Sequence, residues 1–204
     1  MDSNIHIKDN DAFFFELDNV LYPEKDYLLQ VYYLFAQFIE YGEQIDAQGI
    51  TRFMEDAYRN DGDEGIFEKT ASRFGLDPKY RVNFDLLQQN ARLPLKLLLF
   101  APVLEFMQQV AAEDKKLFLL TKGDPLKQLN KIRQLEWNGL EKHLIVYFAE
   151  EIANGSLTGA MEDVIVKHEL NREKTVVIGA DESDKNSALS SKIKFLPIGK
   201  LLVT

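Results

Sequence analysis

Residues 13–23 read FFFELDNVLYP, an apolar run that ends abruptly in two acids separated by one residue, Glu16 and Asp18. A short apolar run of this kind is typical of a buried strand in a parallel sheet. Open sheets of parallel strands bind their ligands in a crevice at the carboxyl ends of the strands. Side chains two residues apart on a strand point to the same side. The stretch therefore predicts two carboxylates delivered together into such a crevice.

Strand and helix patterns alternate along most of the chain. The apolar pattern predicts buried parallel strands over residues 12–17, 116–121, 144–148 and 175–179, and a weaker strand over 194–198. Helical periodicity appears in residues 103–112 and 127–135, and Asp124 is placed to cap the second helix just before Pro125. This alternation predicts an α/β fold, a doubly wound parallel sheet with right-handed crossovers.

One long interval, residues 24–93, has helical periodicity and turn signals but no convincing strand. Turns are predicted at residues 60–63 and 75–78. Large side chains are spaced for a heavily buried helix and continue after a break at Gly49: Tyr27, Leu28, Val31, Tyr32, Leu34, Phe35 and Phe38, then Ile50, Phe53, Met54 and Tyr58. We therefore predict a core domain formed by residues 1–23 and 94–204, with a helical domain inserted over residues 24–93.

The composition excludes several classes of function. With 204 residues, 46% of them apolar and 28% charged, the chain is long enough to bury a full core. Its formal charge of -9 disfavours nucleic acid or an anionic membrane as a partner. The absence of cysteine excludes disulfides, thiolate catalysis and cysteine-rich zinc sites. With no signal-peptide pattern and no long apolar run, the sequence predicts a cytoplasmic protein.

Residues 13–23 resemble the first motif of the haloacid dehalogenase superfamily, whose members are hydrolases and mostly phosphatases. That motif is an apolar strand followed by Asp-x-Asp-x-Thr or Val. Asp18 and Val20 match it, and Glu16 stands where the family has its nucleophilic aspartate. The helical insertion directly after the motif matches the cap of one branch of the superfamily. The resemblance covers nearly the whole chain and implies a Rossmann-like core with a helical cap that closes over a small phosphorylated substrate.

The first motif carries the chemistry of this family. One carboxylate attacks phosphorus to give an aspartyl-phosphate, and the acid two residues later protonates the leaving group and then activates water. The resemblance implies these roles for Glu16 and Asp18, beside a magnesium ion. Glu16 lengthens the arm by roughly 1.5 Å, a bond length's worth. Displacements of about 1 Å can cost on the order of a hundredfold in rate.

The second motif is the strand end at Thr121, followed by Lys122 and Gly123 at a helix start. A hydroxyl beside exposed backbone amides at a helix amino terminus can hold a phosphate oxygen. The resemblance implies that Thr121 contacts phosphate, with Lys122, Gly123 and Tyr22 bordering the substrate. The alternative is a threonine that only caps the helix.

The third and fourth motifs depart from the family pattern. No lysine occurs in residues 144–166, where the family has one; Lys122 and Lys167 are alternative routes to the site or surface residues. After the strand at 175–179, Ala180 stands where the principal metal-binding aspartate belongs. Asp184 lies at the spacing of the second acid. Asp181 or Glu182 is an alternative oxygen donor to magnesium, and a plain acidic turn is the simpler interpretation.

Three functional hypotheses follow. The first is a magnesium-dependent phosphatase with impaired or altered catalysis that acts on a small phosphorylated metabolite, in which Glu16, Asp18 and Thr121 are catalytic. Its metal side would comprise Glu16, Asp18, Asp181 and Asp184. The second is a catalytically inactive relative that binds a ligand or a protein. The third is a dehalogenase proper, which needs no metal but shares the problem of a lengthened nucleophile.

Overall fold

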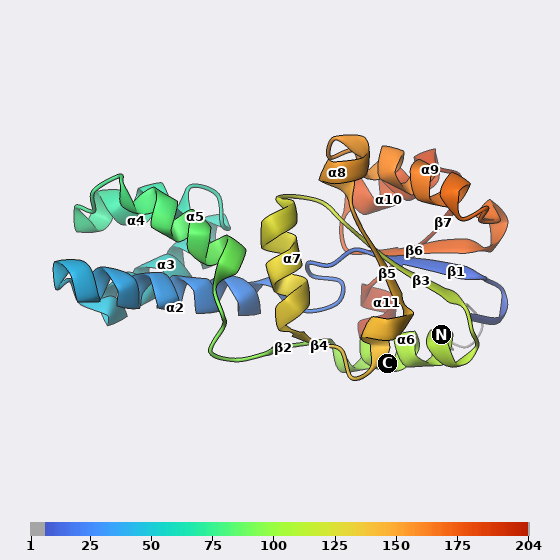
Figure 1. Cartoon of the computed structure of the whole chain (residues 1–204), viewed down its shortest axis with the longest axis horizontal. Coiled ribbons are helices and arrows are strands. Elements are labelled where there is room, and N and C mark those ends of the chain that lie inside the picture. Colours follow the sequence, from blue (N-terminus) through green and yellow to red (C-terminus); the bar gives the residue numbers. More distant parts are fainter. Residues whose placement is uncertain (1–6, 204) are drawn as a thin grey trace. The chain divides into compact units, whose positions relative to one another are not determined.

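A computed structural model describes residues 7–203. In it the chain forms two compact units (Figure 1). The first unit comprises residues 7–23, Leu98–Gln128 and 135–203, and the second comprises Glu24–Leu97 and Leu129–Gln134. Positions 1–6 and 204 of the expected core domain lie outside the described residues. The domain boundaries expected from the sequence stay a prediction.

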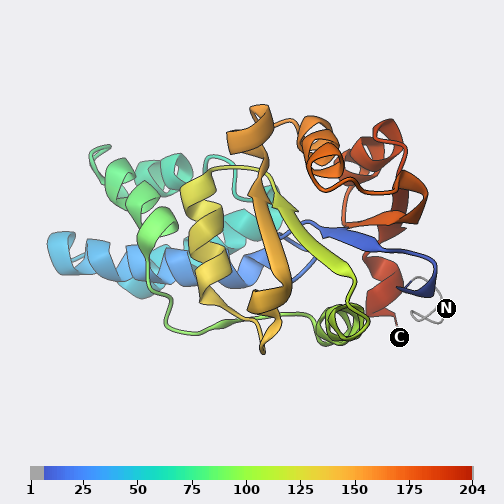
Figure 2. The ribbon, with the colours of Figure 1, turned by 45° about the vertical axis from the view of Figure 1, so that its right-hand side comes forward.

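The first unit is built on a parallel sheet of five strands in the order β5-β3-β1-β6-β7 (Figure 2). Strand β1 lies at the centre, where Phe13 pairs in register with Leu117 on one side and Val176 on the other. This arrangement confirms the predicted fold class. The strands are β1 (Ala12–Phe15), β3 (Lys116–Thr121), β5 (Leu144–Phe148), β6 (Thr175–Gly179) and β7 (Lys194–Pro197).

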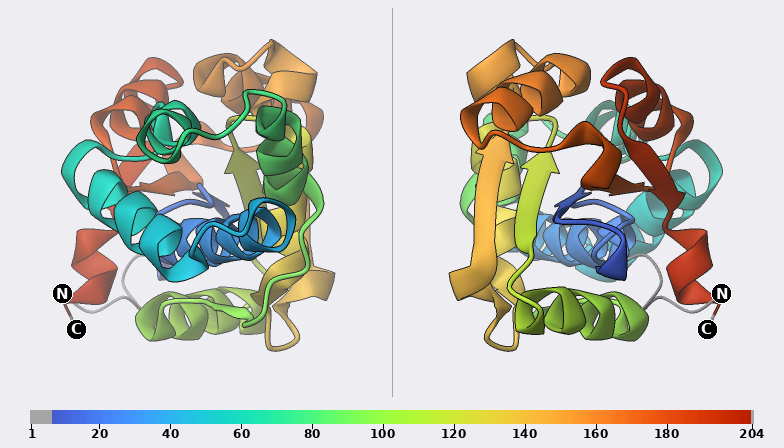
Figure 3. Two further views of the ribbon diagram at one scale, coloured as in Figure 1. Left: turned by 90° about the vertical axis from the view of Figure 1, so that its left-hand side faces the viewer. Right: turned by 90° about the vertical axis from the view of Figure 1, so that its right-hand side faces the viewer.

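Helices cover both faces of this sheet, as a doubly wound fold requires (Figure 3). On one face, Phe14 stacks on Phe118 within a core that α9 and α10 complete. On the other face, Phe13 and Phe15 contact the ring of Phe106 in α6. The helical elements that follow strands of this unit are α6 (Ala101–Ala112), α7 (Pro125–Gln134), η1 (Leu140–His143), α8 (Ala149–Ala153), α9 (Leu157–Lys167), η2 (Arg172–Lys174), α10 (Glu182–Ser190) and α11 (Gly199–Leu202).

Some elements differ from the sequence prediction. Strand β1 ends two residues early, at Phe15, because the chain leaves the sheet for a turn in which the Leu21 N–H donates to the Leu17 carbonyl at 3.0 Å. Strand β5 was expected to be buried but is only half-buried, since it lies at the sheet edge beside β3 alone. Helix α7 begins at Pro125, directly after its Asp124 cap. Two short strands, β2 (Leu97–Leu98) and β4 (Leu135–Glu136), form a separate small sheet that the sequence did not predict.

The second unit is helical, and none of residues 24–93 forms a strand. Its helices are α2 (Glu24–Glu43), α3 (Ala47–Asp61), α4 (Ile66–Phe74) and α5 (Tyr80–Asn90). Rings from three of these helices meet in its core: Tyr32 and Phe35 of α2, Phe67 of α4 and Phe84 of α5. No helix in the described part of the chain is long and apolar enough to cross a membrane.

Two details of the helical insertion were predicted wrongly. Phe38 is 40% exposed, because it lies at the rim of the core, where its ring contacts Tyr80 instead of the interior. Gly49 is not a break between helices: it lies in the first turn of α3, where its N–H donates to the capping Asp46 carboxylate at 2.7 Å. The chain turns before that cap.

Candidate active site

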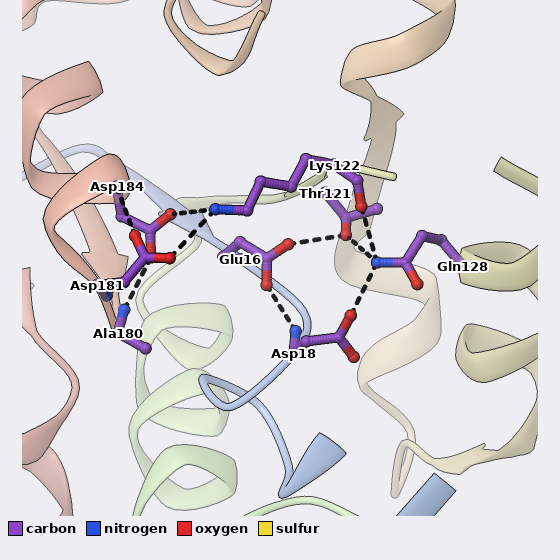
Figure 4. A network of polar contacts seen from close by, with 8 residues as sticks. All are labelled: Glu16, Asp18, Thr121, Lys122, Gln128, Ala180, Asp181 and Asp184. Carbon is purple, nitrogen blue, oxygen red and sulfur yellow. Dashed lines mark hydrogen bonds and ion pairs between the residues drawn. The ribbon is translucent and has the colours of Figure 1, made fainter. Parts of the chain in front are cut away.

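Polar side chains gather at the carboxyl ends of three neighbouring strands of the first unit, β3, β1 and β6 (Figure 4). Because parallel strands place these ends at the same edge of a sheet, residues far apart in the sequence meet here. Strand β1 leads into Glu16 and Asp18, β3 ends at Thr121 and leads into Lys122, and β6 leads into the turn that carries Asp181 and Asp184.

Both carboxyl oxygens of Glu16 are bound by its own neighbours. Oε1 accepts the hydroxyl of Thr121 at 2.9 Å, and Oε2 accepts the backbone N–H of Asp18 at 2.5 Å. The Glu16 side chain is buried, with 6% of the residue exposed. The carboxyl group is therefore held inside the protein between a strand end and a turn.

This environment changes the charge of Glu16. Burial raises its pKa to about 8, and the nearby Asp18 carboxylate adds to the effect, although the Thr121 hydroxyl opposes it. A carboxyl group with such a pKa carries its proton for most of the time at neutral pH. Glu16 is thus mainly a neutral acid near pH 7, not a carboxylate.

Asp18 is fixed from two sides. The Tyr22 hydroxyl donates to Oδ1 at 2.9 Å, and the Gln128 amide donates to Oδ2 at 2.9 Å. Tyr22, expected to border the substrate, is fully buried and makes this contact from the turn after β1.

Gln128 was not singled out from the sequence. Its Nε2 also donates to the Thr121 hydroxyl at 2.8 Å and to the Lys122 carbonyl at 2.9 Å, so it joins the β1 and β3 ends of the site. It lies one turn into α7 and is 3% exposed, while its Oε1 is buried and has no hydrogen-bond partner among the residues that the structure describes. The signal that could have identified it is a polar residue at an inward position of the helix that follows Thr121.

Thr121 does not cap helix α7. The cap is Asp124, whose Oδ1 accepts the backbone N–H groups of Leu126 at 2.8 Å and Lys127 at 3.3 Å. Gly123 forms the intervening turn with a φ of 98°, a conformation that favours glycine. The hydroxyl of Thr121 is instead directed at Glu16.

Lys122 extends past Glu16 to the acids after β6 (Figure 4). Its Nζ lies 3.2 Å from Asp181 Oδ2 and 3.6 Å from Asp184 Oδ1. The two aspartates also form a capping box at the start of α10, because Asp181 accepts the Asp184 N–H at 2.8 Å and Asp184 accepts the Asp181 N–H at 3.3 Å. Lys167, the other alternative, is exposed at the end of α9, with its Nζ 5.1 Å from the centre of the Tyr147 ring.

The acids after β6 do not fit a magnesium ion as they stand. Ala180 supplies only its backbone N–H, which donates to Asp184 Oδ2 at 2.8 Å, and the ammonium of Lys122 faces the remaining oxygens. Glu182, the alternative oxygen donor, pairs with Lys185 at 3.1 Å. Within residues 7–203, no three His, Asp or Glu side chains are grouped to hold a metal ion.

Comparisons of structure relate this arrangement to known proteins. A putative β-phosphoglucomutase from Thermotoga maritima matches 95% of this chain and 97% of its own, with a TM-score of 0.64 and 17% identity. A haloacid dehalogenase-like hydrolase from Streptococcus pneumoniae matches 93% of this chain and 85% of its own, with a TM-score of 0.56 and 19% identity. A HAD family hydrolase from Deinococcus radiodurans R1, solved with bound phosphate and sodium, matches 92% and 80%, with a TM-score of 0.58 and 15% identity.

No protein-family profile matches the chain, and no curated protein matches its sequence. The structural matches span nearly the whole chain at low identity, so they define its fold. This chain has the fold of the haloacid dehalogenase-like hydrolases, a parallel α/β core with an inserted helical unit.

Proposed function

We propose that this chain is a relative of the haloacid dehalogenase-like hydrolases that does not use Glu16 as a nucleophile and acts by binding a small ligand or a protein. The observation that carries the proposal is the engagement of both Glu16 oxygens by Thr121 and Asp18. Glu16 occupies the position of the family's nucleophile, but both of its oxygens are already engaged in hydrogen bonds.

A nucleophilic carboxylate must be ionised and must direct one oxygen at the incoming phosphorus, at about 3–3.5 Å. Glu16 has a pKa of about 8 because it is buried, so the ionised form is the minor one near neutral pH. To attack phosphorus, it would have to lose a proton and give up a hydrogen bond. Both requirements oppose turnover at neutral pH.

The donors around Glu16 also bear on phosphate binding. A threonine hydroxyl has a single proton to donate, and that of Thr121 is directed at Glu16. The Asp18 N–H, the second donor at this point, is directed at the same carboxyl group. A phosphate held by Thr121 would therefore have to displace the Glu16 carboxyl group. This requirement opposes phosphoryl transfer, and it supports a role in binding another ligand or a protein.

A second candidate is a slow phosphatase acting on a small phosphorylated metabolite. It is favoured by the convergence of Glu16, Asp18 and Thr121 at one sheet edge, and by the similarity to a hydrolase solved with bound phosphate. Under this alternative, the ionised fraction of Glu16 grows as the pH passes about 8, and activity rises with it.

The two candidates are separated by hydrolysis of p-nitrophenyl phosphate, with and without Mg²⁺, near neutral pH and at about pH 9. The variants are Glu16→Asp and Glu16→Asp with Ala180→Asp, and Asp18→Asn is the control. We expect a silent wild type and turnover only as the two aspartates are introduced. Wild-type hydrolysis that needs Mg²⁺ and vanishes in Asp18→Asn would establish the phosphatase instead.

A further inference from the structure

We infer that the ammonium of Lys122 is a built-in cation that takes the place of a divalent metal ion between Asp181 and Asp184. This inference concerns the charge on the β6 side of the site. It holds whether or not Glu16 acts as a nucleophile.

The first support is the position of the ammonium. Nζ of Lys122 lies 3.2 Å from Asp181 Oδ2 and 3.6 Å from Asp184 Oδ1, so one positive charge faces two carboxylates at once. Magnesium in proteins is commonly held by one or two carboxylates, with water completing its shell. A single ammonium between two such groups supplies positive charge at the same place, although only half as much as a divalent ion.

The second support comes from Asp184. Its side chain is 3% exposed, and Oδ1 is buried without a hydrogen-bond donor among residues 7–203. Its other oxygen, Oδ2, accepts the backbone N–H of Ala180 at 2.8 Å. A buried carboxylate oxygen without a hydrogen bond is costly unless a charge compensates it. In the described part of the chain, Lys122 is the cation that faces this oxygen.

The third support is the balance of charge across the site. Burial works against the ammonium, but the carboxylates of Asp184 and Asp181 outweigh it and hold the pKa of Lys122 above its usual range. Despite burial, the Asp184 N–H and then the same ammonium keep the pKa of Asp181 below its usual range. Lys122 and Asp181 therefore each favour the charged form of the other, as an ion pair between them requires.

The fold explains why Lys122 can reach this position. It follows β3, and the two aspartates follow β6, while both strands flank β1 in the sheet. The lysine side chain is long enough to cross the intervening strand end and pass Glu16 (Figure 4). At the other end, Asp184 packs closely against the backbone of Gly179. A Cβ on Gly179 would lie only 2.5 Å from the Cβ of Asp184.

An ordinary surface ion pair is the competing explanation, since the side chain of Lys122 is 39% exposed and that of Asp181 is 56% exposed. Such pairs contribute little, and the loss of one creates no metal site. The two explanations therefore differ in what happens when the ammonium is removed.

The test is binding of Mn²⁺, followed by the electron paramagnetic resonance signal of the free ion, to the wild type and to Lys122→Met. The control is Lys185→Met, which removes a lysine of α10 that pairs with the exposed Glu182. We expect Lys122→Met to bind Mn²⁺ about tenfold more tightly than the wild type or the control, because two carboxylates lose their counter-charge. Excess Mg²⁺ should compete for the gained site.

Further variants keep the test decisive. Lys122→Arg retains the charge and should gain no Mn²⁺ binding, whereas adding Asp184→Asn to Lys122→Met should abolish the gain. If Lys122→Met does not fold, Lys122→Gln supplies a second uncharged variant. The inference is overturned if the uncharged variant binds Mn²⁺ no better than Lys185→Met, or if the wild type already binds it equally well. Neither result depends on phosphate hydrolysis, so the proposed function is tested separately.

Discussion

Glu16 and Thr121 lie 105 positions apart in the sequence, yet the hydroxyl of Thr121 donates to the Glu16 carboxyl group at 2.9 Å in the interior of the site. The resemblance to phosphatases gave these two residues separate tasks, attack on phosphorus and capture of phosphate. In the structure the two side chains are instead hydrogen-bonded to each other. The additional methylene of glutamate is long enough for the second oxygen to reach the N–H of Asp18 as well.

The first prediction concerns the pH dependence of stability. In the folded protein the pKa of Glu16 is about 8, against an ordinary value of 4.5. Between these values the folded state holds a proton that the unfolded chain has lost, so stability falls as the pH rises through this window. Glu16→Gln cannot lose a proton. Relative to the wild type, it should gain about 1 kcal/mol or more between about pH 5 and about pH 8.

Urea unfolding at several pH values measures this difference. Glu141→Gln, which alters an exposed glutamate of η1, is the control and should follow the wild type throughout. A wild type and a Glu16→Gln variant whose stabilities stay parallel across the window would contradict the buried, protonated state of Glu16.

The second prediction concerns Gln128. Its amide nitrogen donates to Asp18, Thr121 and the Lys122 carbonyl, so Gln128→Ala removes one donor from each of these partly buried acceptors. Such a loss costs about 1–3 kcal/mol of unfolding free energy. Chemical denaturation of Gln128→Ala should show that loss, while Gln109→Ala at an exposed position of α6 should stay close to the wild type. An unchanged stability of Gln128→Ala would mean that water replaces the amide without cost.

The third prediction concerns the contact between β6 and α10. A Cβ on Gly179 would lie 2.5 Å from the Cβ and 2.7 Å from Oδ2 of Asp184, so Gly179→Ala must displace this aspartate. Overpacking of this kind costs about 1–3 kcal/mol. Gly199→Ala is the matched control, because its Cβ would meet no atom of the described residues within 4 Å. Thermal unfolding of the two variants should differ clearly, and equal midpoints would show that Asp184 is free to move.

The sequence predicts the core of the fold well because its signals are local. The apolar runs that form β1, β3 and β6 and the Asp124 cap of α7 are each visible within a few neighbouring residues. Strand β5 is expected to be buried but is half-buried, because its place at the sheet edge depends on the order of the strands. That order is a property of the whole chain, and the pattern within residues 144–148 does not contain it.

The candidate site is predicted in part for the same reason. The positions of Glu16, Asp18 and Thr121 follow from strand ends, and the structure brings these residues together. Their mutual hydrogen bonds do not follow from the sequence, because they depend on how far one side chain reaches across to the next strand. Lys122 and Gln128 illustrate this, since their side chains donate hydrogen bonds to Asp181 and Asp18, each more than 50 residues away in the sequence.

The most direct test of the account is calorimetric binding of inorganic phosphate to the wild type, Glu16→Gln and Glu16→Ala. The glutamine keeps the shape of the carboxyl group without a charge, whereas alanine releases the Thr121 hydroxyl and the Asp18 N–H. The account predicts that only Glu16→Ala gains binding, by about tenfold or more over the other two. Phosphate binding by the wild type or Glu16→Gln that equals binding by Glu16→Ala would contradict the claim that Glu16 fills the phosphate position.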